Sequence, residues 1–167
     1  MTDSKFFISN LSSVPDKCID DVLSAVSRWE EIIVTIPDNI IIDIEFEFTD
    51  TLGYSRIGGA VLERVYIVTN KTIINTEELS NNYQYGSVIP IKGKIKLNTL
   101  YLDILINTLY SSDKNALYYT VLHEMGHILG ILTIPLYLGI IQYYEEDGVA
   151  NAFYQFEGSN AIREYNS

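Results

Sequence analysis

Residues 120–131 read TVLHEMGHILGI and contain the only two histidines of the 167-residue chain. His123 and His127 are four residues apart, which is about one turn of an α-helix, so a helix places both rings on one face. Two imidazole nitrogens in this position can bind one metal ion at about 2.0–2.1 Å. Glu124 reaches the edge of the same face. The spacing therefore predicts a zinc site with His123 and His127 as ligands and Glu124 as the base that takes a proton from a metal-activated water.

The residues around this motif have the strongest helical pattern of the chain. Apolar residues recur at spacings of three and four from 117 to 129, and Gly130 stands where a C-cap glycine belongs. Residues 111–113, Ser-Ser-Asp, are candidate N-caps, so we expect a helix over residues 113–130. The alternative interpretation of the motif is a pair of incidental histidines on the flank of this helix, paired with Glu124.

Upstream of this helix, apolar periodicity predicts further elements. Residues 40–48, IIIDIEFEF, alternate apolar with acidic residues, which is typical of a strand with one buried face. Residues 60–69 predict another strand, residues 70–92 an irregular segment, and residues 100–110 a helix. An amphipathic helix is expected over residues 15–34, with its apolar face formed by Ile19, Val22, Leu23, Val26, Trp29, Ile32 and Ile33.

Residues 93–99, GKIKLNT, alternate Lys94 and Lys96 with Ile95 and Leu97. Lysines on a short strand are a common way of protecting the edge of a sheet. Because this segment precedes the helix with the histidines, we expect residues 93–98 to form the edge strand that borders the active-site cleft.

Length and composition fit one globular domain. The chain is 47% hydrophobic and 20% charged, and single domains of this length are common. Eleven basic and 22 acidic residues give a net charge of -11. Such a surface repels phosphate, so we expect neither nucleic acid nor anionic membrane surfaces as partners.

Other features exclude several classes of protein. A single cysteine, Cys18, excludes an intramolecular disulfide and a cysteine-based zinc ribbon, and a structural role is expected for it. The longest apolar stretch, residues 128–141, is interrupted by Pro135 and is shorter than the roughly 18 residues of a membrane-spanning helix. The first residues have no signal-peptide pattern. We therefore expect a soluble protein, and the sequence indicates no compartment.

The motif resembles that of the zincin metallopeptidases, and more narrowly of the metzincins, whose helix carries H-E-x-x-H-x-x-G-x-x-H. His123, Glu124, His127 and Gly130 match this pattern, whereas Thr133 stands at the position of the third histidine. Leishmanolysin-like peptidases have an insertion between the glycine and that histidine, and the chain resembles them most. The resemblance covers roughly residues 15–167, and the other similar stretches are AVSRWEEII, GKIKLNTLYLD and GSNAIREYN.

The resemblance implies an α+β, zincin-like fold in one catalytic domain over residues 1–167. It implies a twisted mixed sheet of about four or five strands, with the 15–34 helix packed on it and the active-site helix behind the cleft. The implied function is that of a zinc-dependent endopeptidase with Glu124 as general base and His123 and His127 as zinc ligands. Substrates would be proteins or peptides that bind in extended form along an edge strand.

The motif does not identify the third zinc ligand. Catalytic zinc has three protein ligands and a fourth position that is left for water or substrate, and the motif provides two of the three ligands. In the resembled family the third histidine and the methionine turn lie further on, so the chain would be the N-terminal portion of a longer protease. Alternatively, a carboxylate 18–20 residues after His127 could bind the metal, and the candidates are Glu145, Glu146 and Asp147. A solvated acidic turn is the simpler interpretation of these three residues.

The remaining alternative is a catalytically inactive or incomplete zincin-fold protein with a structural or binding role. With two histidine ligands, we expect weak zinc binding and poor peptidase activity from this chain alone. Tyrosines could polarise a substrate carbonyl, although packing roles are more common; the candidates are Tyr137, Tyr143, Tyr144 and Tyr154.

Overall fold

The structure, a computed structural model of the chain, describes residues 4–33, 36–37, 40–80, 82–131, 134–135, 138, 141–144 and 153–156. The α-helices of this part are α1 (Ile19–Ile32), α2 (Leu102–Asn107) and α3 (Ala116–Ile128). The strands are β1 (Phe6–Ile8), β2 (Ile42–Thr49), β3 (Gly58–Ile67), β4 (Thr72–Asn75), β5 (Val88–Asn98), β6 (Ile141–Tyr144) and β7 (Phe153–Phe156). None of the helices among these residues is long and apolar enough to cross a membrane.

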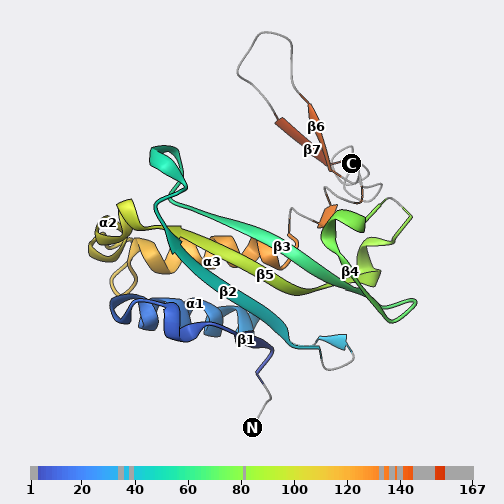
Figure 1. Cartoon of the computed structure of the whole chain (residues 1–167), viewed down its shortest axis with the longest axis horizontal. Coiled ribbons are helices and arrows are strands. Elements are labelled where there is room, and N and C mark those ends of the chain that lie inside the picture. Colours follow the sequence, from blue (N-terminus) through green and yellow to red (C-terminus); the bar gives the residue numbers. More distant parts are fainter. Residues whose placement is uncertain are drawn as a thin grey trace.

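Five strands form one mixed sheet in the order β1-β2-β5-β3-β4 (Figure 1). β1, β2 and β5 are parallel to one another, whereas β3 runs antiparallel to both β5 and β4. β6 and β7 form a separate antiparallel pair. The expected α+β class and a mixed sheet of about five strands are thus confirmed at this level.

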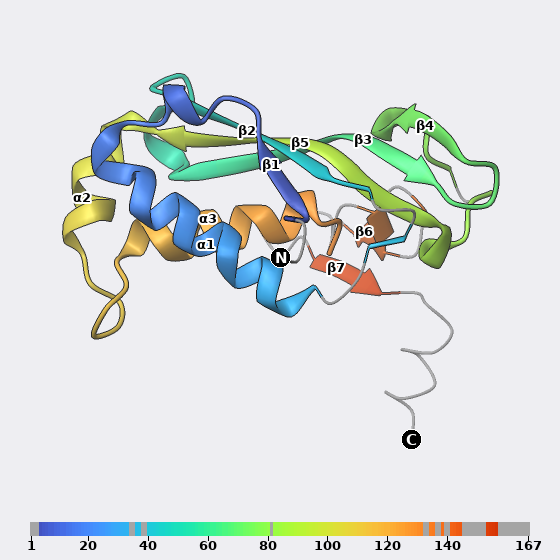
Figure 2. The ribbon, with the colours of Figure 1, turned by 90° about the horizontal axis from the view of Figure 1, so that it is seen from below.

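Helices α1 and α3 lie side by side on one face of the sheet (Figure 2). The alternation in β2 buries Ile42, Ile44 and Phe46 beneath them, as the sequence predicted. These side chains join one apolar core with buried residues of α1, α3 and β5, among them Val22, Ala25, Leu117, Val121, Met125, Ile128, Ile95 and Leu97. Leu23 and Ile32, which were expected on the buried face of the first helix, are exposed, because α1 contacts its neighbours through a narrower stripe.

Gly93 in β5 allows α3 to lie directly against the sheet. A β-carbon at this position would lie only 2.7–2.9 Å from three side-chain carbons of Ile128, closer than real β-carbon contacts come. Ile128 is itself fully buried. The absence of a side chain at residue 93 therefore sets the distance between α3 and β5.

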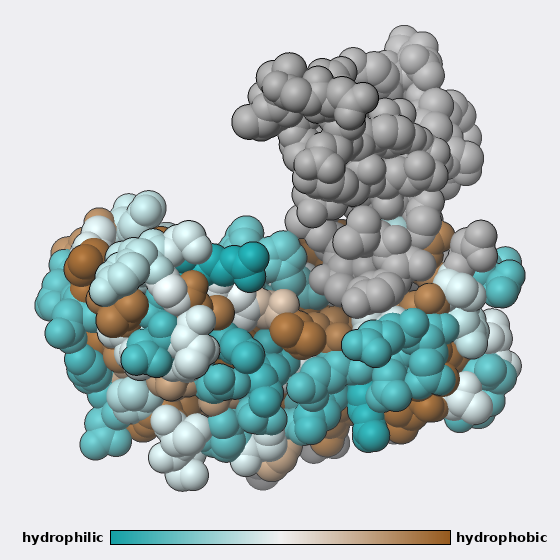
Figure 3. All heavy atoms as spheres, turned by 45° about the horizontal axis from the view of Figure 1, so that its top comes forward, coloured by the Kyte–Doolittle hydropathy of each residue, from teal (hydrophilic) through white to brown (hydrophobic). Residues whose placement is uncertain are grey.

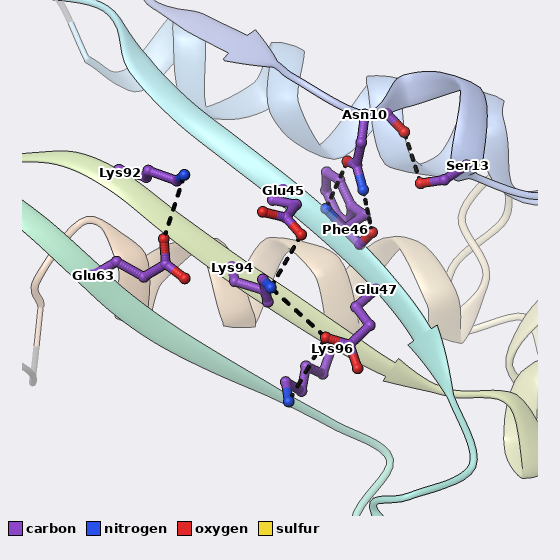
Figure 4. A network of polar contacts seen from close by, with 9 residues as sticks. All are labelled: Asn10, Ser13, Glu45, Phe46, Glu47, Glu63, Lys92, Lys94 and Lys96. Atoms are coloured by element: carbon purple, nitrogen blue, oxygen red, sulfur yellow. Dashed lines mark hydrogen bonds and ion pairs between the residues drawn. The ribbon is translucent and has the colours of Figure 1, made fainter.

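The other face of the sheet carries a ladder of ion pairs across three strands (Figure 4). Lys94 Nζ lies 3.0 Å from Glu45 Oε1, and the more distant pairs are Lys94–Glu47, Lys96–Glu47 and Lys92–Glu63. Glu45 stands opposite Lys94 in the register of β2 with β5, and Glu47 stands opposite Lys96. The charges of β5 are therefore neutralised by the strands on either side of it.

The prediction that residues 93–98 form an edge strand is wrong. β5 is central and pairs with β2 on one side and β3 on the other, and both Ile95 and Leu97 are fully buried. The lysines did not indicate an edge, because a central strand can also carry lysines when glutamates of the adjacent strands pair with them. The segment predicted as irregular, residues 70–92, contains β4 and the start of β5.

An exposed edge lies instead on β3. β4 pairs only with the second half of β3, from Arg64 to Ile67. The first half, residues 58–62, pairs with β5 alone within the described part of the chain. Because β3 also contacts α3, this half-strand borders the helix that carries the histidines.

Candidate functional site

Helix α3 is fixed at both ends. The side chain of Asn115 accepts a hydrogen bond from the Tyr118 amide and donates one to Asp21 of the α1 helix, at 3.0 and 2.8 Å. Asn115, and not residues 111–113, is therefore the N-cap. At the other end Gly130 has φ +81°, and its amide bonds the carbonyl of His127, as expected of a glycine C-cap.

The two histidine rings lie on one helical face with their Nε2 atoms 3.1 Å apart. The ring planes are nearly perpendicular, at 85°. Two nitrogens bound to one tetrahedral metal at about 2.05 Å would be separated by roughly 3.3 Å. The predicted convergence of the ring nitrogens is thus confirmed, and the pair fits two positions of a tetrahedral zinc site.

Glu124 is buried beside this pair, with 8% of its surface exposed. Loss of hydration raises the pKa of its carboxyl above the ordinary 4.5, and nearby His123 lowers the pKa only in part. A β-carbon on Gly58 would lie 3.4 Å from Glu124 Oε1. The carboxylate therefore lies against the start of β3, next to the edge that β4 leaves unpaired.

His127 is less exposed than His123, and burial lowers the pKa of its ring below the ordinary 6.5. The charge of a protonated His123 lowers this pKa further. Metal ions bind the neutral imidazole. The environment of His127 thus favours the form that can act as a ligand.

Two cavities flank His123. The first, of about 470 Å³, is apolar and lies between α1 and α3; it is lined by Trp29, Leu122, Gly126 and Ile131 together with Tyr119 and both histidines. Trp29 is held there by a 3.0 Å hydrogen bond from its Nε1 to the carbonyl of Leu122. Figure 3, which brings the top of Figure 1 forward, shows apolar surface in the middle of the visible face between hydrophilic residues.

The second cavity, of about 490 Å³, lies on the other side, between the start of β3 and the N-terminal half of α3. Glu124, which is buried, and His123, which is exposed, both line it. Its other walls are formed by Ile57, Gly58, Leu105, Tyr110 and Tyr119, with Ser55, Ala116 and Thr120. Glu124 lines this cavity but not the first one.

Asn98 fixes the loop that forms one wall of the second cavity. Its fully buried side chain donates hydrogen bonds to the carbonyls of Gly53 and Arg56 and accepts one from the Leu100 amide. The backbone amide of Asn98 also donates a hydrogen bond to the carbonyl of Ile57. The chain segment before β3 is therefore attached to the end of β5.

Sequence reasoning missed several residues of this site. Gly58 and Tyr110 gave no local signal, because they reach the motif only through the fold. Tyr119 lies four residues before His123, so the same helical spacing that paired the histidines could have placed it on their face. Cys18 is buried in the core, as expected of a structural residue.

Other candidates lie outside the described residues or their described side chains. These are Tyr137, Glu145, Glu146 and Asp147, and the side chains of Tyr143, Tyr144 and Tyr154; Thr133, at the position of the third histidine, also lies outside the described residues. Among the residues that are described, no group of three or more His, Cys, Asp or Glu side chains could hold a metal ion. The structure therefore supplies the histidine pair and Glu124 but no third ligand from its described part.

The chain was compared with protein families, curated proteins and solved structures. No family model matches it, and no curated protein and no solved structure matches it either. The assignment of a function therefore rests on the geometry around His123, Glu124 and His127.

Proposed function

We propose that the protein is a zinc-dependent endopeptidase. The observation that carries this proposal is the convergence of His123 and His127 on one point, 3.1 Å apart at Nε2, beside the buried carboxylate of Glu124. Two ligands and a base on a single helical turn are part of the arrangement that metal-assisted peptide hydrolysis needs, which also includes a third ligand.

His123 and His127 would hold the zinc ion through Nε2. Zinc, when bound, polarises the substrate carbonyl and lowers the pKa of a water molecule. A third donor is not among the described residues. The open candidates in the sequence are Glu145, Glu146 and Asp147.

Glu124 would act as the general base and then as the general acid. Its carboxylate takes a proton from the attacking water and returns it to the nitrogen of the leaving amine. The desolvation that raises its pKa suits this role, because a carboxyl with a raised pKa holds the proton between the two steps more readily.

The unpaired half of β3 would bind the substrate. An extended peptide can add to a sheet edge through main-chain hydrogen bonds. Residues 58–62 offer such an edge next to Glu124, since a β-carbon on Gly58 would lie 3.4 Å from the carboxylate. This assigns to β3 the role that the sequence had predicted for residues 93–98.

The test is zinc binding and cleavage of an unfolded protein substrate by the purified chain. We expect zinc binding that His123→Ala abolishes, and slow cleavage that Glu124→Gln reduces by about 100-fold or more. Glu63→Gln, a change of the same chemistry on the opposite face of the sheet, is the matched control and should leave both unchanged. Cleavage that survives Glu124→Gln, or zinc binding equal in the His123→Ala variant, would contradict the proposal.

A second candidate is a zincin-like protein without activity, in which the site has a structural or binding role. The observation that favours it is the lack of a third donor among the described residues. Zinc binding that depends on His123 and His127, without any cleavage that depends on Glu124, would support this second function.

A further inference from the structure

Trp29 joins helix α1 to the half of α3 that carries the histidines, where the two helices lie side by side (Figure 2). Its indole Nε1 donates a 3.0 Å hydrogen bond to the carbonyl of Leu122. Asp21 and Ser24, earlier on α1, bond the side chains of residues 114–115 at the start of α3. Helix α1 thus holds α3 at two places, and Trp29 provides the contact beside the histidines.

Gly126 is the weak point of the helical turn between the two histidines. Glycine in the interior of a helix makes that helix about fivefold less stable than alanine does. Trp29 covers this residue, since a β-carbon at position 126 would lie 3.6 Å from Cζ2 of the indole. In an α-helix the amide of residue 126 bonds the carbonyl of residue 122, which is the carbonyl that Trp29 bonds. The indole therefore lies against both ends of the hydrogen bond that closes this turn.

The bond from Trp29 has a positional effect. The Leu122 carbonyl has a partner within the helix, so the indole N–H does not supply a donor that this carbonyl would otherwise lack. Trp29 is only partly buried in the core, and it lines the first cavity together with Leu122, Gly126 and both histidines. The indole thus fixes the turn at the place where the side chains of the site begin.

The geometry of the histidine pair depends on this turn. His123 directly follows Leu122 and His127 directly follows Gly126, so a distortion of the turn changes the distance between the two rings. Their Nε2 atoms are 3.1 Å apart, close to the roughly 3.3 Å of two ligands on one tetrahedral zinc. Ligands that are already held at the required separation lose less conformational entropy on binding. A group that fixes the turn therefore raises the affinity of the pair for a metal ion.

We infer that Trp29 is a positioning residue for the histidine pair: its indole fixes the turn 122–127 so that His123 and His127 are held at the separation that one metal ion requires. The inference rests on the proposed function for the identity of this ion, zinc. An indole is a hydrogen-bond donor only, so Trp29 acts through the helix and not as a ligand. Its loss should lower the zinc affinity about tenfold, since groups that support metal ligands contribute about 10–100-fold.

The first experiment measures zinc affinity by isothermal titration calorimetry, at a temperature where circular dichroism shows every variant to be folded. Trp29→Phe keeps an aromatic ring and loses the Nε1 donor, and we expect it to bind zinc about tenfold more weakly than the wild-type chain. The matched control is Val26→Ala, because Val26 is buried on the same helix and lines neither cavity. It should keep the wild-type affinity within about twofold. Equal weakening in the two variants, or no weakening in Trp29→Phe, would overturn the inference.

Gly126→Ala provides a rescue of the Trp29→Phe variant. The new methyl group would make ordinary contacts with Trp29 and Ile131, at 3.6 and 3.4 Å, so the wild-type turn accommodates it. Alanine stiffens the turn through its higher helix propensity, and in the Trp29→Phe background it should restore zinc affinity about fivefold. In the wild-type background, where the indole already fixes the turn, it should change the affinity much less. A double variant that binds zinc no better than Trp29→Phe would contradict the positioning role.

Amide hydrogen exchange in EDTA gives a measurement that does not depend on zinc. Trp29→Phe should speed exchange of the Gly126 and His127 amides about fivefold relative to that of Val121, earlier in α3, because one hydrogen bond to this turn is lost. A change that is uniform along α3 would indicate loosening of the whole helix and would overturn the inference. If the wild-type chain binds no zinc, the proposed function fails, and the local exchange rates still decide whether Trp29 holds the turn of the histidine pair.

Discussion

Glu124 shows at the scale of one residue how a functional group can oppose stability. Its pKa is raised because folding removes water from the carboxyl. Between the ordinary value of 4.5 and the raised value, the folded state binds more protons than the unfolded state does. Stability therefore falls as the pH rises through this window, and the cost is fully present above the raised pKa.

We therefore predict that Glu124→Gln stabilises the metal-free fold at neutral pH while reducing the proposed cleavage by about 100-fold or more. The amide keeps the shape of the side chain and has no charge to desolvate. The melting temperature in EDTA at pH 7 should rise, and the gain should disappear near pH 3, well below the ordinary pKa of 4.5, where the wild-type carboxyl is protonated in both states. Equal melting temperatures at pH 7 would show that the carboxylate is well solvated.

Asn98 is the corresponding case for a residue that positions the site. Asn98→Ala removes the fully buried amide that donates to the carbonyls of Gly53 and Arg56 and accepts from the Leu100 amide. We expect a loss of about 2 kcal/mol in the free energy of unfolding, measured by urea denaturation, because each of these hydrogen bonds contributes about 0.5–1.5 kcal/mol. Asn107→Ala, which removes an exposed Nδ2 bond to Asp103, is the matched control and should cost less than about 1 kcal/mol.

At the scale of elements, the close contact between α3 and β5 depends on Gly93. Gly93→Ala should lower the free energy of unfolding by about 1–3 kcal/mol, because the new methyl group overlaps Ile128. Gly59→Ala is the control: a β-carbon there meets nothing within 4 Å, so a change within about 0.5 kcal/mol is expected.

A double-mutant cycle tests whether the overlap with Ile128 is the cause. Ile128→Ala alone should cost about 2–5 kcal/mol by opening a cavity. Combined with Gly93→Ala it should cost clearly less than the sum of the two single changes, since the added methyl group then occupies part of that cavity. Strict additivity in urea denaturation would show that the two residues do not compete for one space.

The elements that the sequence predicted well are those whose signal is local. Each of these elements presents one face to the core. The alternation in β2 and the helical spacing around Val121 and Met125 therefore indicate directly which face is buried. The histidine pair was found for the same reason: its geometry is contained in one helical turn. The N-cap Asn115 was missed because residues 111–113 offer the same chemistry slightly earlier.

What the sequence did not reveal depends on residues far apart in the chain. The lysines of β5 indicated an edge only as long as their partners, Glu45, Glu47 and Glu63, were unknown. Likewise Gly58 and Tyr110 become part of the candidate site only when β3 and the α2–α3 loop are brought to α3. Pairings of this kind are set by topology, which local periodicity does not encode.

At the scale of the whole molecule, zinc should stabilise the fold if the proposed site exists. A ligand that binds only the folded state adds about 2.7 kcal/mol at 100 times its dissociation constant. We expect zinc to raise the melting temperature of the wild-type chain and to leave that of His127→Ala unchanged. The measurement is a thermal unfolding series in increasing zinc, with magnesium as the control ion.

Two results of that series would contradict the prediction. An equal shift in His127→Ala would indicate that zinc binds elsewhere, for which the net charge of -11 offers many weak acidic sites. An equal shift with magnesium would indicate screening of this charge and not coordination by imidazole, which magnesium binds poorly.

The central position of β5 has a consequence for how the chain acquires its structure during synthesis. The ribosome delivers β1, β2, β3 and β4 before the strand that joins the two halves of their sheet. Until Asn98 has emerged, the chain can form the β3–β4 hairpin from neighbouring residues, while β2 can pair with β1 but lacks β5 on its other side. The sheet then closes late, when β5 pairs with β2 and β3. The lysines of β5 meet the glutamates of the two neighbouring strands at this step. If β5 paired one residue out of register, its lysines would face the apolar core, because successive side chains of a strand point to opposite faces.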